Sequence, residues 1–422
     1  MTPTHGVLLG GLVLLACACG SAGHPQSGTP DVAPTSPSDG GSASDAGAAS
    51  ACAQLLPSVV TPKVFVLPQD TWVSARRGLI TCNGGASDGL GNLAFPVQTY
   101  GQNPGDPPGE ARIYVVDPSS GAVLHATDLM GERSIWTVFS VGLQDGFLAV
   151  TTDFSRLQQH LVWLGHTGAP TGARHEPAEE IPNELLATLP DGRAILVSGQ
   201  ESPSGSSAAL EEYGSDGGLQ WSTPMPGSRG FPLFAAVDVS GNTLLEQFEG
   251  DGGVSLTWID EAGVVGASFG MRGPIIIMFQ RAEGGFFLSS SAQWVGQVSS
   301  GGHAIEPPPD WLPTPPFTST RTSFMVTPGR DGYVIDRRFT VPTSSTLEVR
   351  SAAGEVCGEV QLFPLGSPPL VSPRTVALGA DGTPILSGLS CLSSGVVSPA
   401  LQVNAGVPVC SCAWQYWPAL LR

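Results

Sequence analysis

Arginine residues recur along this sequence at similar positions, each a few residues before an apolar run. The chain has 36 acidic residues against 18 basic ones and a single lysine, Lys63, so these cations stand out. Guanidinium groups bind carboxylates and phosphates through paired hydrogen bonds. If the fold gathers them, we expect an anionic ligand such as an acidic glycan or a carboxylate-bearing peptide. The alternative is that each arginine pairs with a nearby acid or loop carbonyl. The candidate ligand-binding residues are Arg76, Arg77, Arg133, Arg229, Arg272, Arg321 and Arg374, and one further segment has Arg174 and His175 somewhat earlier.

Motifs of known catalytic or metal chemistry are weak. The sequence has no Gly-x-Ser-x-Gly and no His-Glu-x-x-His, and Cys410-Ser-Cys412 has neither zinc nor thioredoxin spacing. His160 and His166 flank a short apolar run and are predicted to be solvated loop residues. The catalytic residues stay unassigned, and no metal or cofactor is expected.

Adjacent acids give the one hint of hydrolytic chemistry. Glu211-Glu212 and Glu179-Glu180 could serve as carboxylate pairs in glycoside cleavage. Neighbours in a strand point to opposite faces, however, which favours surface charges. Asp216 precedes Gly-Gly but lacks the alternating oxygen ligands of a calcium loop, so it is predicted to be a turn acid, as is Asp251.

Tryptophans are spread almost one to a segment of the body, which favours packing between repeated units. A sugar could stack on one of them, Trp136 or Trp311. The set is Trp72, Trp136, Trp163, Trp221, Trp258, Trp294 and Trp311.

Composition bounds the fold class and the partners. Charged residues make up 13% of the chain, while Gly (55) and Pro (38) are abundant, as in an all-β protein rich in tight turns. Helical turns are expected only between residues 177 and 189. A net charge of -18 repels nucleic acid and anionic lipid headgroups, so nucleic acid is excluded as a partner.

Turn signals followed by apolar runs recur every 43 to 57 residues through the body. They are Asp88-Gly89, Asp145-Gly146, Asp191-Gly192, Ser240-Gly241, Glu283-Gly284, Asp331-Gly332 and Asp381-Gly382. A later glycine follows each one: Gly121, Gly168, Gly217, Gly263, Gly301, Gly354 and Gly406. Two hairpins in about 50 residues is the size of a four-stranded propeller blade. We therefore predict an all-β, seven-bladed β-propeller of four-stranded antiparallel blades, with a pair of β-sandwiches or a six- or eight-bladed ring as alternatives.

The predicted ring has two distinct ends. Both glycine turns of every repeat fall at one end, and the loops that lead into each first strand fall at the other, around the channel mouth where propellers usually bind ligands. The arginines belong to this second set of loops. The body resembles WD40-like and quinoprotein-like propellers in architecture, and the copy with Asp191-Gly192, Tyr213, Gly217 and Trp221 is the most similar to a quinoprotein repeat. This resemblance implies that Trp221 docks on the next blade, and it carries over no quinone or catalytic residue.

The N-terminus resembles a bacterial lipoprotein signal. Residues 6–16 are a short apolar run that is too short to span a bilayer, and it leads into Leu14-Leu15-Ala16-Cys17. This run is similar to a lipobox, which implies that Cys17, or else Cys19, is acylated after cleavage. An ordinary secretory signal is the alternative. Because no Asp comes directly after either cysteine, the resemblance implies outer-membrane residence.

Three segments are expected: a lipoprotein signal peptide (1–19), a disordered tether rich in Gly, Ser, Pro and Ala (20–55), and the propeller (56–422). Six further cysteines in an exported chain suggest disulfides, namely Cys52, Cys82, Cys357, Cys391, Cys410 and Cys412. A bond from Cys52 or Cys82 to the C-terminal group would lock the ring, whereas local pairing of the C-terminal cysteines is the alternative.

These features predict a monomeric, lipid-anchored binding or scaffolding module of the cell envelope. Its partner would be an anionic glycan or peptide, or another envelope protein, and it would touch the membrane through the anchor alone. The alternative is an extracytoplasmic hydrolase or lyase acting on glycans, since propellers support both kinds of function.

Overall fold

The computed structural model of the 422-residue chain describes the body of the protein. The chain divides into residues 1–50 and residues 51–422, and all described residues lie in the second unit. For some strand residues only the backbone is described. The described residues are 52, 55, 63–68, 70, 79–82, 84–100, 110–129, 135–153, 158–176, 183–189, 191–202, 205–225, 234–248, 254–271, 277–290, 293–313, 321–327, 332–339, 344–361, 370–371, 376–391 and 410–416.

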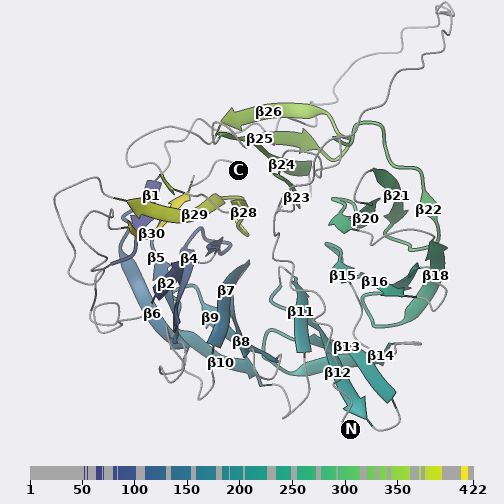
Figure 1. The fold of residues 1–422 in the computed structure, drawn as a ribbon, viewed down its shortest axis with the longest axis horizontal. Helices are drawn as coiled ribbons and strands as arrows, with labels where there is room; N and C mark the ends of the chain where they lie inside the picture. The colour runs from purple at the N-terminus through teal and green to yellow at the C-terminus, as the bar shows by residue number, and fades with distance from the viewer. Residues whose placement is uncertain are drawn as a thin grey trace, which may run out of the picture. The chain divides into compact units, whose positions relative to one another are not determined.

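Seven antiparallel sheets make up this unit, and we number them as blades in chain order (Figure 1). Blade 1 contains β2 (Leu79–Cys82), β3 (Ala86–Ser87), β4 (Leu93–Tyr100), β5 (Ala111–Val116) and β6 (Val123–Leu129). Blade 2 contains β7 (Ile135–Leu143), β8 (Gly146–Asp153), β9 (Gln158–Gly165) and β10 (Pro170–His175). Blade 3 contains β11 (Asn183–Thr188), β12 (Ala194–Ser202), β13 (Gly205–Tyr213) and β14 (Leu219–Pro224). Blade 4 contains β15 (Phe234–Val237), β16 (Thr243–Phe248), β17 (Val254–Ile259) and β18 (Val265–Met271). Blade 5 contains β19 (Ile277–Gln280), β20 (Gly285–Ser289), β21 (Trp294–Ser299) and β22 (Ile305–Glu306). Blade 6 contains β23 (Arg321–Val326), β24 (Gly332–Phe339), β25 (Ser344–Ser351) and β26 (Val356–Gln361). Blade 7 contains β27 (Leu370–Val371), β28 (Val376–Leu378), β29 (Pro384–Cys391), β30 (Cys410–Tyr416) and β1 (Lys63–Val66).

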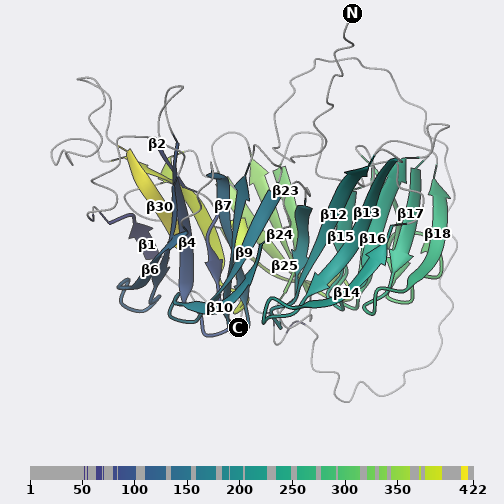
Figure 2. The ribbon, with the colours of Figure 1, turned by 90° about the horizontal axis from the view of Figure 1, so that it is seen from below.

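The predicted seven-bladed propeller is therefore confirmed, and the six- and eight-bladed rings and the paired sandwiches are not. The first strand of each blade lies nearest the central axis and the last lies at the periphery (Figure 1). Figure 2 shows the sheets from the side, with their strands running between the two ends of the ring. The turns between strands one and two and between strands three and four share one end, which we call the glycine end. Each innermost strand begins at the other, which we call the entry end.

Blade 7 is assembled from both ends of the chain. β1 pairs with β30 in the register Lys63 to Tyr416 through Val66 to Ala413, and so supplies the outermost strand. The seventh repeat consequently has no hairpin between its third and fourth strands. Gly406 precedes β30 in the chain, so it cannot close that turn, and the paired-glycine pattern predicted from the sequence holds for six repeats.

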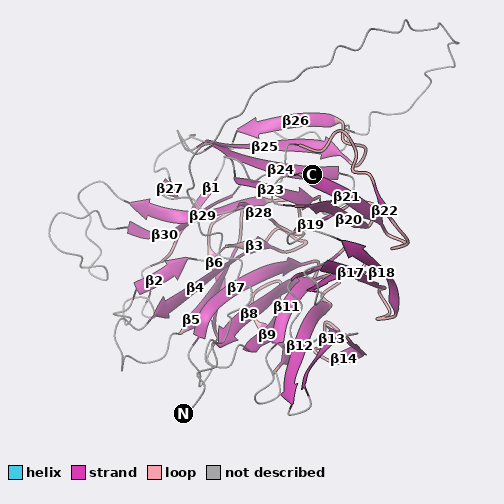
Figure 3. Ribbon diagram, turned by 45° about the vertical axis from the view of Figure 1, so that its right-hand side comes forward, coloured by secondary structure: helices cyan, strands magenta, loops and turns pink. Residues whose placement is uncertain are grey.

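The predicted helical turns near residue 185 are wrong, because Asn183–Thr188 form β11 and pair with β12. Leu185 packs into the cluster between blades 2 and 3, whereas Leu186 packs into the cluster between blades 3 and 4. Successive residues of a strand point to opposite faces, and here both faces are covered. A two-sided burial of this kind has no helical periodicity to detect. The described residues contain strands and turns and no helix, as Figure 3 shows.

The hydrophobic core is a series of clusters, each between two neighbouring blades. The seam between blades 7 and 1 is the most aromatic of the well-buried ones. Trp414 of β30 stacks on Phe95 of β4 with ring centroids 4.7 Å apart, and Phe65 of β1 lies 4.9 Å from the same Phe95 ring. All three side chains are buried. At about 25 cal/mol per Å² of apolar surface, each of these rings contributes roughly 2–3 kcal/mol.

Candidate functional site

The structure brings together the strands that the candidate arginines precede, and it describes few of the arginines themselves. Arg76, Arg77, Arg133, Arg229, Arg272 and Arg374 lie outside the described residues. Arg321 is the first residue of β23, the innermost strand of blade 6, and only its backbone is described. Arg374 falls between β27 and β28, which both pair with β29, so its place in the chain is an interruption of an innermost strand. Arg174 and His175 belong to β10, the outermost strand of blade 2.

The described side chains of the innermost strands are mainly apolar, and many of them pack against the clusters between blades. Those described in β7, β11, β15, β19, β23 and β28 are largely half-buried, which places them between the blade interfaces and solvent. The apolar ones include Phe139, Val141, Leu185, Ala235, Ile277, Met278, Phe279, Phe324, Met325 and Leu378. Among the described side chains of these strands, Glu184 is the one that carries a charge.

Glu184 of β11 is the candidate acid at the axis. Solvent reaches its side chain, yet desolvation by the surrounding protein raises the pKa of its carboxyl. An acid whose pKa moves towards neutrality can transfer protons as a general acid or base. No sequence motif identifies Glu184, because it is a single acid in a run of small and apolar residues.

A polar cluster lies between blades 2 and 3. His160 Nδ1 is 2.6 Å from Glu176 Oε2, and the His175 ring lies 4.2 Å from the ring of Tyr213, centroid to centroid. Asn183 Nδ2 is 3.4 Å from His175 Nε2. Burial lowers the pKa of His175, and the neighbouring His160 adds to this, while Glu176 opposes it.

Of the two histidines predicted to be solvated loop residues, His166 does lie in a turn with its side chain 35% exposed, but both histidines have partners. His160 lies in β9 with its side chain only 17% exposed, because the strand continues further than its polar residues suggested. His166 Nδ1, in the turn that follows β9, is 2.8 Å from Asp88 Oδ2 of blade 1. Both histidines therefore belong to the packing of the ring.

The acids singled out from the sequence serve turns and ion pairs where they are described. Asp216 accepts a 2.9 Å hydrogen bond from the Gly218 N–H, as predicted for a turn acid. Glu212 is buried and accepts from Arg193 Nη1 at 3.1 Å, whereas Glu211 accepts from the Tyr213 hydroxyl at 3.0 Å. The two neighbours point to opposite faces and do not form a carboxylate pair. Asp251, Glu179 and Glu180 lie outside the described residues.

Five of the seven tryptophans singled out from the sequence have described side chains, and all five pack between or beneath blades. Trp221 lies against Gly263 of the next blade, so close that an added Cβ would come within 2.7 Å of its ring, and the predicted docking of Trp221 is confirmed. Trp258 and Trp311 lie in the same way against Gly302 and Gly354. Trp163 Nε1 donates to the Gly192 carbonyl at 2.8 Å, and Trp294 Nε1 to the Pro313 carbonyl at 2.7 Å.

The two tryptophans considered for sugar stacking do not provide a described platform. Trp311 packs against the rings of Phe287 and Tyr333, with centroids 5.7 and 5.3 Å away, so it belongs to the core between blades 5 and 6. The side chain of Trp136 is not described, and Trp72 lies outside the described residues.

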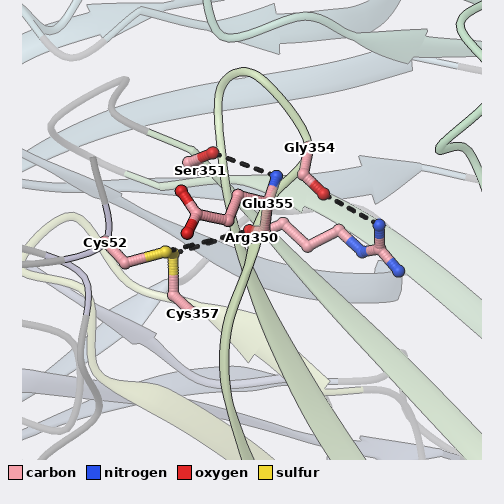
Figure 4. The surroundings of a disulfide bond; sticks show 6 residues. All are labelled: Cys52, Arg350, Ser351, Gly354, Glu355 and Cys357. Carbon is pink, nitrogen blue, oxygen red and sulfur yellow. Dashed lines mark hydrogen bonds between the residues drawn. A yellow bond between two sulfur atoms is a disulfide. The ribbon is translucent and has the colours of Figure 1, made fainter. Parts of the chain in front are cut away.

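A disulfide joins Cys52 to Cys357, 305 residues apart (Figure 4). Cys357 lies at the start of β26, just after the turn in which the Glu355 N–H donates to Ser351 Oγ and Arg350 Nη1 donates to the Gly354 carbonyl. The predicted bond from Cys52 to the C-terminal cysteines is confirmed, although its partner belongs to blade 6. Cys52 is the described end of the chain ahead of β1, so the bond fixes this segment at the glycine end.

Cys82, Cys391, Cys410 and Cys412 are described by their backbones alone. Cys17 and Cys19 lie outside the described residues, together with the predicted signal peptide and most of the tether. Cys52 and Leu55, which fall in the stretch assigned to the tether, are buried in the domain. Across the described ranges, no helix is long and apolar enough to cross a membrane, and no three His, Cys, Asp or Glu side chains converge as metal ligands would.

Comparison with known proteins gives fold likeness alone. No family model matches the chain, and no curated protein does. Among solved structures, a quinoprotein alcohol dehydrogenase-like protein from Bacteroides thetaiotaomicron is similar at 12% identity and a TM-score of 0.38, covering 67% of this chain and 66% of that one. The Dos1 propeller is similar at 10% identity and a TM-score of 0.40, covering 80% and 78%. Prolyl oligopeptidase B from Galerina marginata is similar at 9% identity and a TM-score of 0.45, with 75% of this chain and 48% of that one covered.

The chain thus spans less than two thirds of the first of these proteins and about half of the peptidase. Sheet order and register define residues 51–422 as a seven-bladed β-propeller with quinoprotein-like structural neighbours.

Proposed function

We propose that this protein is a lipid-anchored propeller of the bacterial outer membrane that binds an anionic ligand at its entry end, as a binding or scaffolding module. The anchor is Cys17, with Cys19 as the second choice, and the ligand is an acidic glycan or a carboxylate-bearing peptide, free or displayed on another envelope protein. The protein acts as a monomer.

The observation that carries this proposal is the shared end at which the innermost strands begin. Chain connectivity keeps a residue within about 3.3–3.6 Å per residue of its neighbours along the chain. Arg77 and Arg133 each precede the first residue of an innermost strand, Leu79 or Ile135, by two positions. Arg321 begins such a strand itself. Arg229 and Arg272 precede theirs, Phe234 and Ile277, by five.

The Cys52–Cys357 disulfide supports the exported location. Disulfides persist in oxidising compartments such as the periplasm and are rare in the cytosol. A ring closed by β1 and cross-linked by this bond is a rigid scaffold, and rigid scaffolds hold recognition loops in place at low entropic cost.

Ligand binding is tested by thermal shift with acidic glycans and acidic peptides. The triple variant Arg229→Ala/Arg272→Ala/Arg321→Ala should lose the shift that the native protein shows. Arg193→Ala is the matched control, because Arg193 follows the Gly192 turn at the glycine end and its loss should leave the ligand-induced shift unchanged. Equal shifts in the native and triple-variant proteins would refute the cationic entry end.

Anchoring is tested separately by detergent phase partitioning and labelling with a fatty-acid analogue. Cys17→Ser should abolish incorporation of the label, and Cys19→Ser should not. Label retained in Cys17→Ser and lost in Cys19→Ser would move the anchor to the second choice, and label in neither native protein nor variants would refute it.

A glycan-active enzyme is the second candidate, and Glu184 is the residue that favours it. Its raised pKa and axial position suit a general acid. Turnover of an acidic glycan that is lost in Glu184→Gln, with ligand binding retained, would establish the enzyme. If the glycan is unchanged after prolonged incubation with the native protein, the enzyme is refuted and the binding module remains the proposed function.

A further inference from the structure

Four cysteines remain once Cys52 and Cys357 are paired, and the strand register places all four at one seam. Cys391 and Cys410 are directly opposite each other in the pairing of β29 with β30, and Cys412 is opposite Leu389. Cys82 is directly opposite Val97 in the pairing of β2 with β4. The backbones of all four are described, so their faces follow from register.

Blade 7 turns one face towards blade 1, and three of the cysteines share that face. Trp414 and Tyr416 of β30 and Ile385 of β29 belong to the cluster between the two blades. Alternate residues of a strand share a face, so Cys410 and Cys412 are in phase with Trp414. Directly opposite residues also share a face, which puts Cys391 with Cys410.

Blade 1 turns the matching face towards blade 7, and Cys82 shares it. Phe95 and Val97 of β4 belong to the same cluster as Trp414. Cys82 is opposite Val97, so it is on the face that contains them. β2 also approaches β29 and β30, with Cα atoms within 8 Å.

Disulfide geometry selects one pairing of the three that four cysteines allow. Directly opposite residues of an antiparallel pair have Cα atoms about 4.5–5.5 Å apart, within the range of about 4.4–6.8 Å that disulfides span. Cys391 and Cys410 meet this condition. Cys410 and Cys412, two residues apart on one extended strand, would have Cβ atoms roughly 6.6 Å apart, beyond the roughly 3.5–4.5 Å that the Cβ atoms of a disulfide usually span. Cys391 and Cys412 are diagonal neighbours, about 7–8 Å apart, which is too far for a disulfide. We propose that Cys391 is bonded to Cys410 and Cys82 to Cys412.

The chemistry of formation is ordinary thiol–disulfide exchange. Each pair of thiols loses two protons and two electrons as its S–S bond forms, and a protein disulfide of the oxidising compartment accepts them and becomes a dithiol. The Cys82–Cys412 bond would fasten blade 1 to blade 7, on the opposite side of blade 7 from the bond that fastens the Cys52 segment to blade 6. Blade 7, which is assembled from both chain ends, would then have a cross-link on either side.

Peptide mapping of the full chain exported into an oxidising compartment tests this pairing. The protein is alkylated in denaturant without reduction and cleaved with trypsin, which cuts after Arg77, Arg112 and Arg374. The peptides 78–112 and 375–422 should appear joined and should separate on reduction. Peptide 78–112 recovered alone, or alkylation at all four cysteines, would overturn the proposal, as would stoichiometric zinc whose chelation exposes the thiols.

Serine variants assign the two bonds within the joined peptides. Cys391→Ser should make Cys410 the alkylated residue, and Cys82→Ser should make it Cys412, as fragment masses report. Cys52→Ser is the matched control, because it should expose Cys357 and leave the joined peptides intact. Exchange of the two outcomes would disprove the stated pairing. The native map is independent of whether any variant folds.

Discussion

At the scale of single residues, the glycines that face tryptophans leave no room for a side chain. Gly354 has a φ of +88° and lies against Trp311, with an added Cβ 2.2 Å from the ring. Gly121, in the corresponding turn of blade 1, has a φ of +71° and open space around it. The pair separates backbone strain from loss of packing.

Gly354→Ala should therefore destabilise the protein by about 3 kcal/mol or more, since the left-handed backbone costs about 1–2 kcal/mol and the tryptophan must also move. Gly121→Ala should cost only the backbone part. Urea unfolding of both variants measures the difference, and equal losses would show that the ring of Trp311 yields freely.

His175 should make stability depend on pH. Burial lowers the pKa of His175 in the folded state. As the pH falls below the unfolded-state pKa of about 6.5, the unfolded chain therefore takes up the proton first. The stability that His175 contributes is complete above that pH and is lost as pH falls through the folded-state pKa. The groups that face it are His160, Glu176, Asn183 and Tyr213.

His175→Gln should flatten the fall in unfolding free energy between pH 7.5 and pH 5, measured by urea unfolding at each pH. The exposed His125 of β6 provides the control, and His125→Gln should keep the native slope. A slope unchanged by His175→Gln would mean that the proton is taken up elsewhere.

At the scale of elements, β1 shows how one short strand can close the ring. Its Phe65 is buried and stacks on Phe95, whereas Val64, on the opposite face, is 39% exposed. β1 is also fixed at its first residue, where Lys63 Nζ donates to the carbonyls of Pro118 and Ser119 at 2.7 and 2.9 Å.

Phe65→Ala should cost about 3–5 kcal/mol, as truncation of buried aromatic residues does, and should expose the edge of β30. Val64→Ala should cost a few tenths of a kcal/mol. The two variants differ by one position in a single strand, so unfolding curves compare the two faces directly. Similar losses in both would show that β1 acts by its backbone pairing alone.

The prediction of strands and turns succeeded where the sequence contains a turn signal, and it failed where both faces of a strand are buried. Asp-Gly and Gly signals placed most hairpins, because a left-handed turn residue demands glycine. The strand β11 was not predicted, because Leu185 and Leu186 are adjacent and pack on opposite faces, so the segment lacks the polar–apolar alternation of a strand with one buried face. Glu184 was missed because its pKa depends on neighbours from other strands, which no local pattern encodes.

At the scale of the whole molecule, the Cys52–Cys357 bond closes a loop of 305 residues. In the chain-entropy model, loops of this length contribute about 5 kcal/mol through the unfolded state. Cys52→Ser/Cys357→Ser should lose about 2–5 kcal/mol and should behave like native protein with this bond reduced. Thermal unfolding of the native protein and of the double variant, both without reductant, checks this, and a double variant as stable as the native protein would contradict it.

The number of blades was predictable from the sequence, but their closure was not. Periodicity counts repeats, whereas the origin of the outermost strand of blade 7 depends on which chain end reaches β30. Gly406 fitted the spacing of the repeats yet precedes the strand it was expected to follow.

β1 precedes almost every other described segment and β30 follows all of them, yet they hydrogen-bond to each other. During synthesis, β1 is therefore made long before its partner β30, the last of the described strands. Such distant pairing is slow, because the intervening chain has to be ordered before the contact repays its entropy. A nascent chain that stops before Cys410 leaves Phe65 and the edge of β29 uncovered, so blade 7 forms only once β30 has been made.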